Sequence, residues 1–135
     1  MGRAAPNKPV LLTEKEIVWV HNKAVQHYGG LPSRTEPGRL SPVVSRVRNL
    51  ELYEGVSDIF TLAAMYCVAI ARAHLFADGN KRTSMNSMML FLKRNGIRPH
   101  MVDDLEERVI SAATGELTAP ELADWLRRNY SRNDA

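Results

Sequence analysis

Apolar residues recur at helical spacing along most of the chain, and glycine, proline and polar residues interrupt the pattern. Thr13 and Glu16 have the spacing of a capping box, and the apolar positions behind them continue to Tyr28. Ser41 is predicted as the N-cap of a second helix, because Pro42 follows it and apolar positions recur beyond. Both stretches are typical of amphipathic helices that begin at a polar side chain.

A third stretch, residues 59–71, is apolar nearly all round. Ser57 is its predicted N-cap, and a helix that lacks a polar face is usually central in its fold. The stretch is well short of the roughly 20 residues that a membrane-spanning helix needs, and charged residues follow it closely. We therefore expect a buried central helix and no membrane partner.

Three further helices are predicted in the second half of the chain. The first begins at Asn80, contains several methionines that are expected to fill the core, and stops at residues 95–96. The next covers residues 103–113. The last opens with a second capping box, formed by Thr118 and Glu121.

The fold class that follows is all-α: a compact bundle of about six helices around the central buried helix. No stretch of convincing length alternates between polar and apolar residues, so no sheet is expected. Residues 31–40 contain prolines and a glycine and predict a loop or short hairpin. We expect one domain over residues 1–135, with flexible ends at residues 1–9 and 131–135.

The composition indicates a globular protein of a reducing compartment. The chain has 135 residues, of which 44% are apolar and 24% charged, and this balance excludes disordered and fibrous proteins. Cys67 is the only cysteine, so no disulfide can form within the chain and a reducing compartment is expected. The sequence near the N-terminus does not resemble a signal peptide, and we expect a cytoplasmic protein.

The net charge of +3 is unevenly distributed. Basic side chains gather in residues 72–98, whereas residues 103–124 are mainly acidic. Within the basic region, residues 74–82 read His-Leu-Phe-Ala-Asp-Gly-Asn-Lys-Arg and join the end of the central helix to the start of the next. This segment carries the candidate chemistry.

The groups in this segment suit the binding of a phosphate. Gly79 beside a helix start lets backbone N–H groups turn toward an anion, and the helix dipole adds positive charge. Lys81 and Arg82 lie in the first turn of the predicted helix, where positive charges oppose the helix dipole and lower stability. Their presence there is better explained by the binding of a ligand. Asp78 is an oxygen ligand of the kind that holds Mg²⁺ together with substrate phosphates. His74 is the candidate general base, because histidine readily exchanges protons near neutral pH.

Each of these residues alone is more often structural, since single histidines lie in cores, Asp-Gly forms turns and Lys-Arg faces solvent. Together, within nine residues, they favour nucleotide-dependent transfer of a phosphoryl or nucleotidyl group to a hydroxyl. A non-catalytic helical module that binds DNA or a partner stays open as another class. The helix from Asn80 offers few side chains for reading base edges, so we expect no direct contact with nucleic acid.

The segment also resembles a known signature. Residues 74–82 are similar to the Fic signature His-x-Phe-x-[Asp/Glu]-Gly-Asn-Gly-Arg, in the Doc form that has lysine at the eighth position. Other segments that resemble Doc-type members are residues 28–32, 37–39, 86–96, 112–116 and 123–130. The chain is therefore identified as a member of the Fic/Doc family, and the resemblance implies a Fic-like helical bundle.

The resemblance assigns a role to most residues of the signature. It implies that His74 is the general base that takes the proton from the target hydroxyl, and that Asp78 coordinates Mg²⁺. It also implies that Gly79 and Asn80 form the anion hole around the phosphates of ATP, and that Arg82 pairs with these phosphates.

Lys81 decides what the resemblance implies about the reaction. Typical Fic enzymes have a glycine at this position, which leaves room for ATP to present its α-phosphate, and AMP is transferred. In Doc-type toxins the lysine is associated with a reversed nucleotide that presents its γ-phosphate, so Lys81 favours a protein kinase that uses ATP and Mg²⁺. The implied target is a threonine of elongation factor Tu, whose modification arrests translation. Gly79, where the Doc form has alanine, keeps AMP transfer to a protein hydroxyl open.

Regulation is expected to come from a second protein. Many Fic enzymes carry an inhibitory helix with the pattern Ser/Thr-x-x-x-Glu-Gly/Asn. Glu54 is the only glutamate followed by glycine or asparagine, and Leu50 stands four residues before it. The resemblance therefore implies a Phd-like antitoxin that binds the toxin through a segment folding on contact. It also implies that residues 31–39 are a flap that aligns the target segment.

Overall fold

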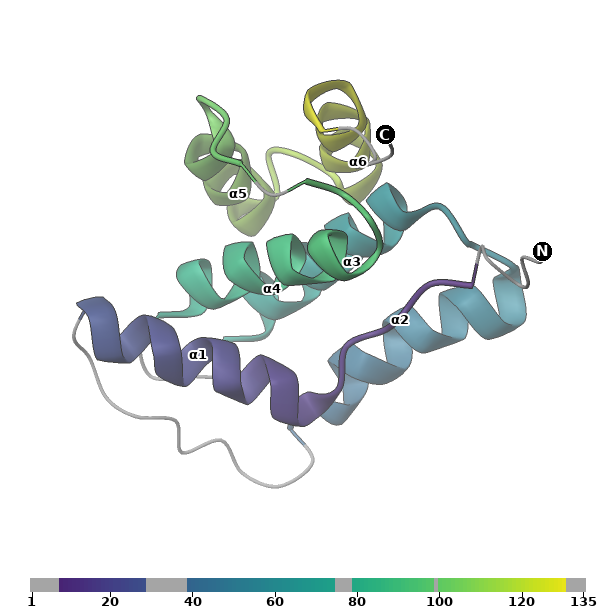
Figure 1. The fold of residues 1–135 in the computed structure, drawn as a ribbon, viewed down its shortest axis with the longest axis horizontal. Helices are drawn as coiled ribbons and strands as arrows, with labels where there is room; N and C mark the ends of the chain where they lie inside the picture. Colours follow the sequence, from purple (N-terminus) through teal and green to yellow (C-terminus); the bar gives the residue numbers. More distant parts are fainter. Residues whose placement is uncertain (1–7, 29–38, 75–78, 99, 131–135) are drawn as a thin grey trace.

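The computed structural model describes residues 8–28, 39–74, 79–98 and 100–130, and these contain six α-helices and no β-strand. The helices are α1 (Glu14–Tyr28), α2 (Ser41–Glu54), α3 (Ile59–Ala73), α4 (Asn80–Arg94), α5 (Leu105–Thr114) and α6 (Ala119–Asn129) (Figure 1). The predicted all-α class and number of helices are confirmed. Several predictions concern residues outside the described ranges. They are those for residues 31–38 of the loop, for the chain ends at residues 1–7 and 131–135, and for Asp78.

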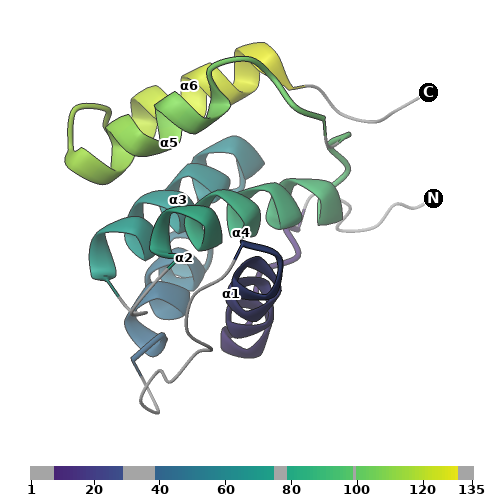
Figure 2. The same ribbon diagram turned by 90° about the vertical axis from the view of Figure 1, so that its left-hand side faces the viewer.

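The helices form three layers. In both views α3 and α4 lie side by side in the middle layer, with α5 and α6 on one side and α1 and α2 on the other (Figure 1, Figure 2). The contacts agree with this arrangement, since α3 packs against α2, α4, α5 and α6, and α4 also packs against α1 and α5. The two helices that flank the candidate segment therefore form the centre of the molecule.

The central helix α3 is buried on nearly every side, as its apolar sequence predicts. Its buried residues are Ile59, Phe60, Leu62, Ala63, Ala64, Tyr66, Cys67, Val68, Ile70 and Ala71. Tyr66 packs on Phe91 of α4 with ring centroids 5.2 Å apart, a separation at which aromatic pairs are favourable. In the described part of the chain, no helix combines the length and the apolarity needed to cross a membrane.

Tyr66 also anchors the segment that precedes α1. Its hydroxyl oxygen accepts a hydrogen bond from the backbone N–H of Leu12 at 2.9 Å, and the side chain of Leu12 is buried in the core. Burial raises the pKa of Tyr66 to about 12. The hydroxyl therefore stays protonated at physiological pH and holds the start of α1 close to α3.

Both predicted capping boxes are present. Thr13 Oγ1 accepts a hydrogen bond from the backbone N–H of Glu16 at 3.2 Å, and Glu16 Oε1 accepts one from the N–H of Thr13 at 2.8 Å. Thr118 and Glu121 form the same reciprocal pair at α6, at 3.2 and 2.9 Å. The starts of α1 and α6 are therefore determined by local sequence.

The prediction that Ser41 is an N-cap is wrong. α2 begins at Ser41, so Leu40 holds the N-cap position with φ −85° and ψ −13°, a helical conformation, and offers no side-chain hydrogen bond. Ser41 Oγ instead donates a hydrogen bond to Glu14 Oε2 at 3.0 Å. The serine therefore links α2 to α1 rather than capping its own helix.

The prediction that Ser57 caps α3 is wrong by one residue. Asp58 holds the N-cap position with φ −68° and ψ 115°, and its Oδ2 accepts hydrogen bonds from Thr61 N at 3.1 Å and Thr61 Oγ1 at 2.7 Å. The same carboxylate pairs with Arg127 of α6. Asp58 is preferred because its negative charge suits a helix N-terminus and because it binds a second helix as well.

The start of α5 also differs from its prediction at Asp103. α5 begins at Leu105, because Asp104 adopts the left-handed conformation with φ 76° and interrupts the helix there. Gly115, with φ 91°, ends α5 as predicted.

The double role of Asp58 generates a prediction about stability. Burial alone would raise the pKa of Asp58, but the hydrogen bonds from Thr61 and Arg127 outweigh burial and lower this pKa. The stabilisation is therefore present at neutral pH and is lost as the pH falls below about 4, through the lowered pKa. We expect Asp58→Ala to reduce the free energy of unfolding by about 1–2 kcal/mol at neutral pH and by less in acid.

Urea denaturation of the wild type and the variant at pH 7 and pH 3 measures this difference. Ser57→Ala is the matched control and should stay within about 0.5 kcal/mol of the wild type. A loss at Ser57 as large as that at Asp58 would contradict the assignment of the cap.

Candidate active site

The candidate residues lie where α3 ends and α4 begins. His74 follows the last residue of α3, occupies its C-cap position and adopts the left-handed conformation with φ 50° and ψ 49°. This conformation is uncommon outside glycine, although histidine is among the residues that enter it more often. The residue is exposed, so its imidazole is accessible to a ligand.

Gly79 is the N-cap of α4, with φ 76° and ψ 18°. It has no side chain that could bond the first N–H groups of the helix, and the first turn of α4 contains no acidic residue. The carbonyl oxygen of Gly79 accepts a hydrogen bond from Thr83 N at 2.9 Å, so the helix is regular from its start. The N-terminus of α4 therefore presents backbone donors to an anion such as a phosphate.

The first turn of α4 contains the other predicted phosphate-binding residues. Asn80 and Arg82 are half-buried and take part in interactions within the protein. Lys81 is exposed, and its Nζ lies 3.5 Å from Glu106 Oε2 of α5. An exposed ion pair contributes little to stability, so Lys81 can exchange Glu106 for a phosphate without a large loss.

A residue that sequence reasoning missed lies behind Gly79. His21 of α1 is 1% exposed, and its Cδ2 and Nε2 atoms lie 3.6 Å from the position that a Cβ atom on Gly79 would occupy. The sequence feature that could have identified His21 is its helical spacing. It lies four residues after Ile17 and three before Ala24, and both of these residues are buried on α1. A histidine on an apolar face is usually a core residue, and here it also supports the turn at Gly79.

The structure therefore brings His74 and the residues from Gly79 to Arg82 to adjoining helix ends, whereas Asp78 lies outside the described residues. Among the residues that the structure describes, no group of three or more His, Cys, Asp or Glu side chains could hold a metal ion. Mg²⁺ held by one carboxylate and the phosphates of a nucleotide does not require such a group. The role of Asp78 as its ligand stays a prediction.

Comparisons with known proteins agree with the predicted family. A family model described as the Fic/DOC family matches residues 11–92, from the segment before α1 almost to the end of α4. The chain belongs to the Fic/DOC family. Among individual proteins it is similar to "Protein kinase doc" of Escherichia phage P1, with 41% identity over 119 residues, which cover 88% of this chain and 94% of that protein. The candidate segment 74–82 lies inside the range matched by the family model.

The contact between His21 and Gly79 generates a prediction about the size of residue 79. An alanine Cβ would lie 3.6 Å from His21, which is ordinary contact, so Gly79→Ala should cost only the left-handed strain of about 1–2 kcal/mol. Valine adds two methyl groups close to His21 and Val25. We expect Gly79→Val to lose more stability and to weaken ATP binding, and Gly79→Ala to retain ATP binding.

Gly55→Ala and Gly55→Val are the matched controls, since Gly55 has φ 67° and no atom of the described residues lies within 4 Å of its Cβ position. Urea denaturation measures stability, and isothermal titration calorimetry with ATP measures binding. Equal losses of stability for Gly79→Val and Gly55→Val would show that the neighbouring side chains do not constrain residue 79.

Proposed function

We propose that this chain is a Doc-type toxin kinase that uses ATP and Mg²⁺ to phosphorylate a threonine of elongation factor Tu. The observation that carries the proposal is the placement of His74 and Gly79 at the adjoining ends of α3 and α4, within the range that matches the Fic/DOC family. The similarity to a phage protein that is named a protein kinase supports phosphoryl transfer.

Each residue of the site has one task in this reaction. When bound, ATP supplies the phosphoryl group, and Mg²⁺ at Asp78 neutralises charge on its phosphates. Backbone N–H groups at Gly79 and Asn80 bind and orient the phosphates, supported by the dipole of α4. Arg82 pairs with the phosphate oxygens. An imidazole nitrogen of His74 accepts the proton of the threonine hydroxyl as the threonine oxygen forms the new bond to the γ-phosphorus, and the bond from this phosphorus to the bridging oxygen breaks so that ADP leaves.

Lys81 supports transfer of the γ-phosphate, because a long cationic side chain stands where typical Fic enzymes have glycine. Its exposure and its weak pairing with Glu106 leave it able to reach a phosphate. AMP transfer to a protein hydroxyl is the second candidate. It is favoured by Gly79, which is the residue of the general Fic signature.

We further propose that a Phd-like antitoxin controls this protein and that both act in the cytoplasm. The sequence lacks the inhibitory pattern of many Fic enzymes, which supports control by a separate protein. Cys67 is buried, and burial raises the pKa of its thiol to about 12. A thiol in this state is inert, and a sequence with one cysteine cannot form an internal disulfide, which suits a reducing compartment.

The reaction is tested by incubating the protein with purified elongation factor Tu and ATP that is labelled at either the α- or the γ-phosphate. We expect label on elongation factor Tu from γ-labelled ATP only, because a kinase transfers the terminal phosphate and releases ADP. Mass spectrometry then locates the modified threonine. Label from the α-position alone would establish AMP transfer, and no label from either position would contradict both reactions.

A second experiment separates the enzyme from a non-catalytic module. We expect His74→Ala to reduce phosphoryl transfer by at least about a hundredfold and to abolish growth arrest on induced expression. His100→Ala is the matched control, because His100 is also exposed and follows the opposite end of α4. Circular dichroism should show that both variants are folded. A folded His74→Ala protein that still arrests growth would favour the binding module.

A further inference from the structure

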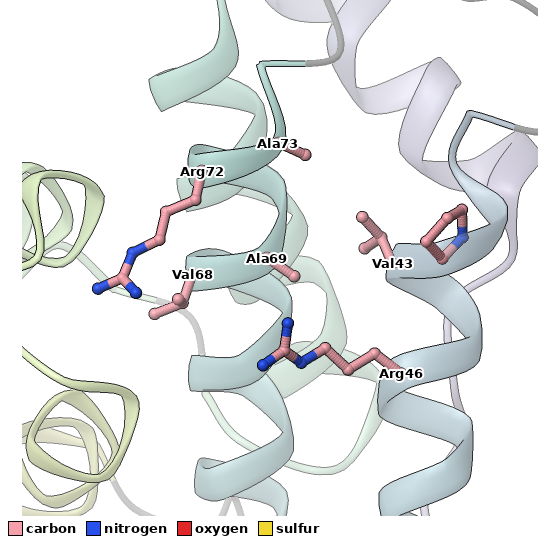
Figure 3. Close-up of a pocket in the computed structure, with 7 residues that line it drawn as sticks. Val43, Arg46, Val68, Ala69, Arg72 and Ala73 are labelled. Carbon is pink, nitrogen blue, oxygen red and sulfur yellow. The ribbon is translucent and has the colours of Figure 1, made fainter.

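A cavity between α2 and α3 lies beside the candidate base and takes no part in the proposed chemistry. Its volume is about 280 Å³. Its lining includes Pro42, Val43 and Arg46 of α2, and Ala69, Arg72 and Ala73 of α3 (Figure 3). Ala73 is bonded to His74, so the cavity ends one residue before the candidate base, although His74 itself does not line it.

The lining combines an apolar floor with positive charge. The floor is formed by proline, valine and alanine side chains, including Val68, and the charged members are Arg46 and Arg72. Among the residues that the structure describes, no carboxylate lines this cavity. A space of this size accommodates one or two apolar side chains of a peptide, and its charge favours an acidic one.

The two arginines differ in what they bind. Arg72 Nε donates a hydrogen bond to the carbonyl oxygen of Ala112 at 3.2 Å, and Figure 3 shows its guanidinium pointing away from α2. Arg46 extends from α2 toward α3 beneath Ala69 (Figure 3). Within the described ranges, no hydrogen bond or ion pair engages Arg46. A guanidinium in this position attracts a carboxylate strongly, because it can donate two parallel hydrogen bonds.

We propose that this cavity is a docking subsite for the protein substrate, which presents an apolar side chain next to an aspartate or glutamate. The apolar side chain enters between Val43 and Ala69, and the carboxylate pairs with Arg46. This inference rests on the proposed function, since a segment docked here brings its hydroxyl to His74. A nucleic acid fits less well, because one unpaired guanidinium over an apolar floor does not match a row of phosphates.

Substitutions in the cavity separate docking from transfer. Arg46→Glu reverses the charge, Ala69→Phe fills the floor, and Arg48→Glu is the matched control, since Arg48 is exposed on the same helix but does not line the cavity. We expect Arg46→Glu and Ala69→Phe to raise the KM for elongation factor Tu about tenfold. The kcat and the KM for ATP should stay unchanged, and Arg48→Glu should match the wild type.

Two kinetic results would overturn the docking subsite. One is an unchanged KM for elongation factor Tu in both cavity variants. The other is a rise in the KM for ATP of the same size, which would place the nucleotide in the cavity.

A binding measurement tests the subsite independently of transfer. The probe is a fluorescein-labelled ten-residue peptide with a central leucine between two glutamates, compared by anisotropy with a peptide that has glutamines instead. We expect the wild type and Arg48→Glu to prefer the glutamate peptide about tenfold, and Arg46→Glu to lose this preference. Equal binding of the two peptides by the wild type would overturn the subsite. Absence of transfer by the wild type would overturn the proposed function, with the peptide preference still deciding the subsite.

Discussion

The structure depends above all on the burial of α3 on nearly every side. A helix without a polar face is stable in water only when other elements surround it, because each exposed apolar side chain loses the favourable free energy of burial. α2 covers it from earlier in the chain, and α4, α5 and α6 cover it from later. The packing of α3 against α4 fixes the two helix ends at which the candidate residues lie. His74 and Gly79 lie nearer the surface, and their positions are set by helices whose other residues are buried in the core.

Much of the fold could be predicted because its signals are local. The spacing of Thr and Glu identified two helix starts, and the apolar composition of residues 59–71 identified the central helix. The caps of α2 and α3 could not be predicted in this way. Ser57 and Asp58 are both favourable N-cap residues, and the contact that distinguishes them, from Arg127 of α6, exists only in the folded chain. The hydroxyl of Ser41 likewise donates its hydrogen bond to Glu14 of α1 and does not cap α2.

The candidate site likewise combines residues that are close in the sequence with residues that only the fold brings together. Its signature could be found because the residues lie within nine consecutive positions. His21 could not be assigned to the site, because only the packing of α1 on α4 brings it to Gly79. The pairing of Lys81 with Glu106 depends in the same way on where α5 packs. Arg46 lines a cavity together with Ala73, the residue before His74, only because α2 lies along α3.

The contact between α6 and the start of α3 also bears on how the protein is made. Arg127 binds Asp58, and its guanidinium lies 5.8 Å from the centre of the Phe60 ring. Two helices separate α3 from α6 along the chain, so α3 leaves the ribosome well before the helix that covers this side of it. Its apolar surface is open to chaperones until α6 has emerged. The core of a protein proposed to arrest translation is thus completed only after α6 has been translated.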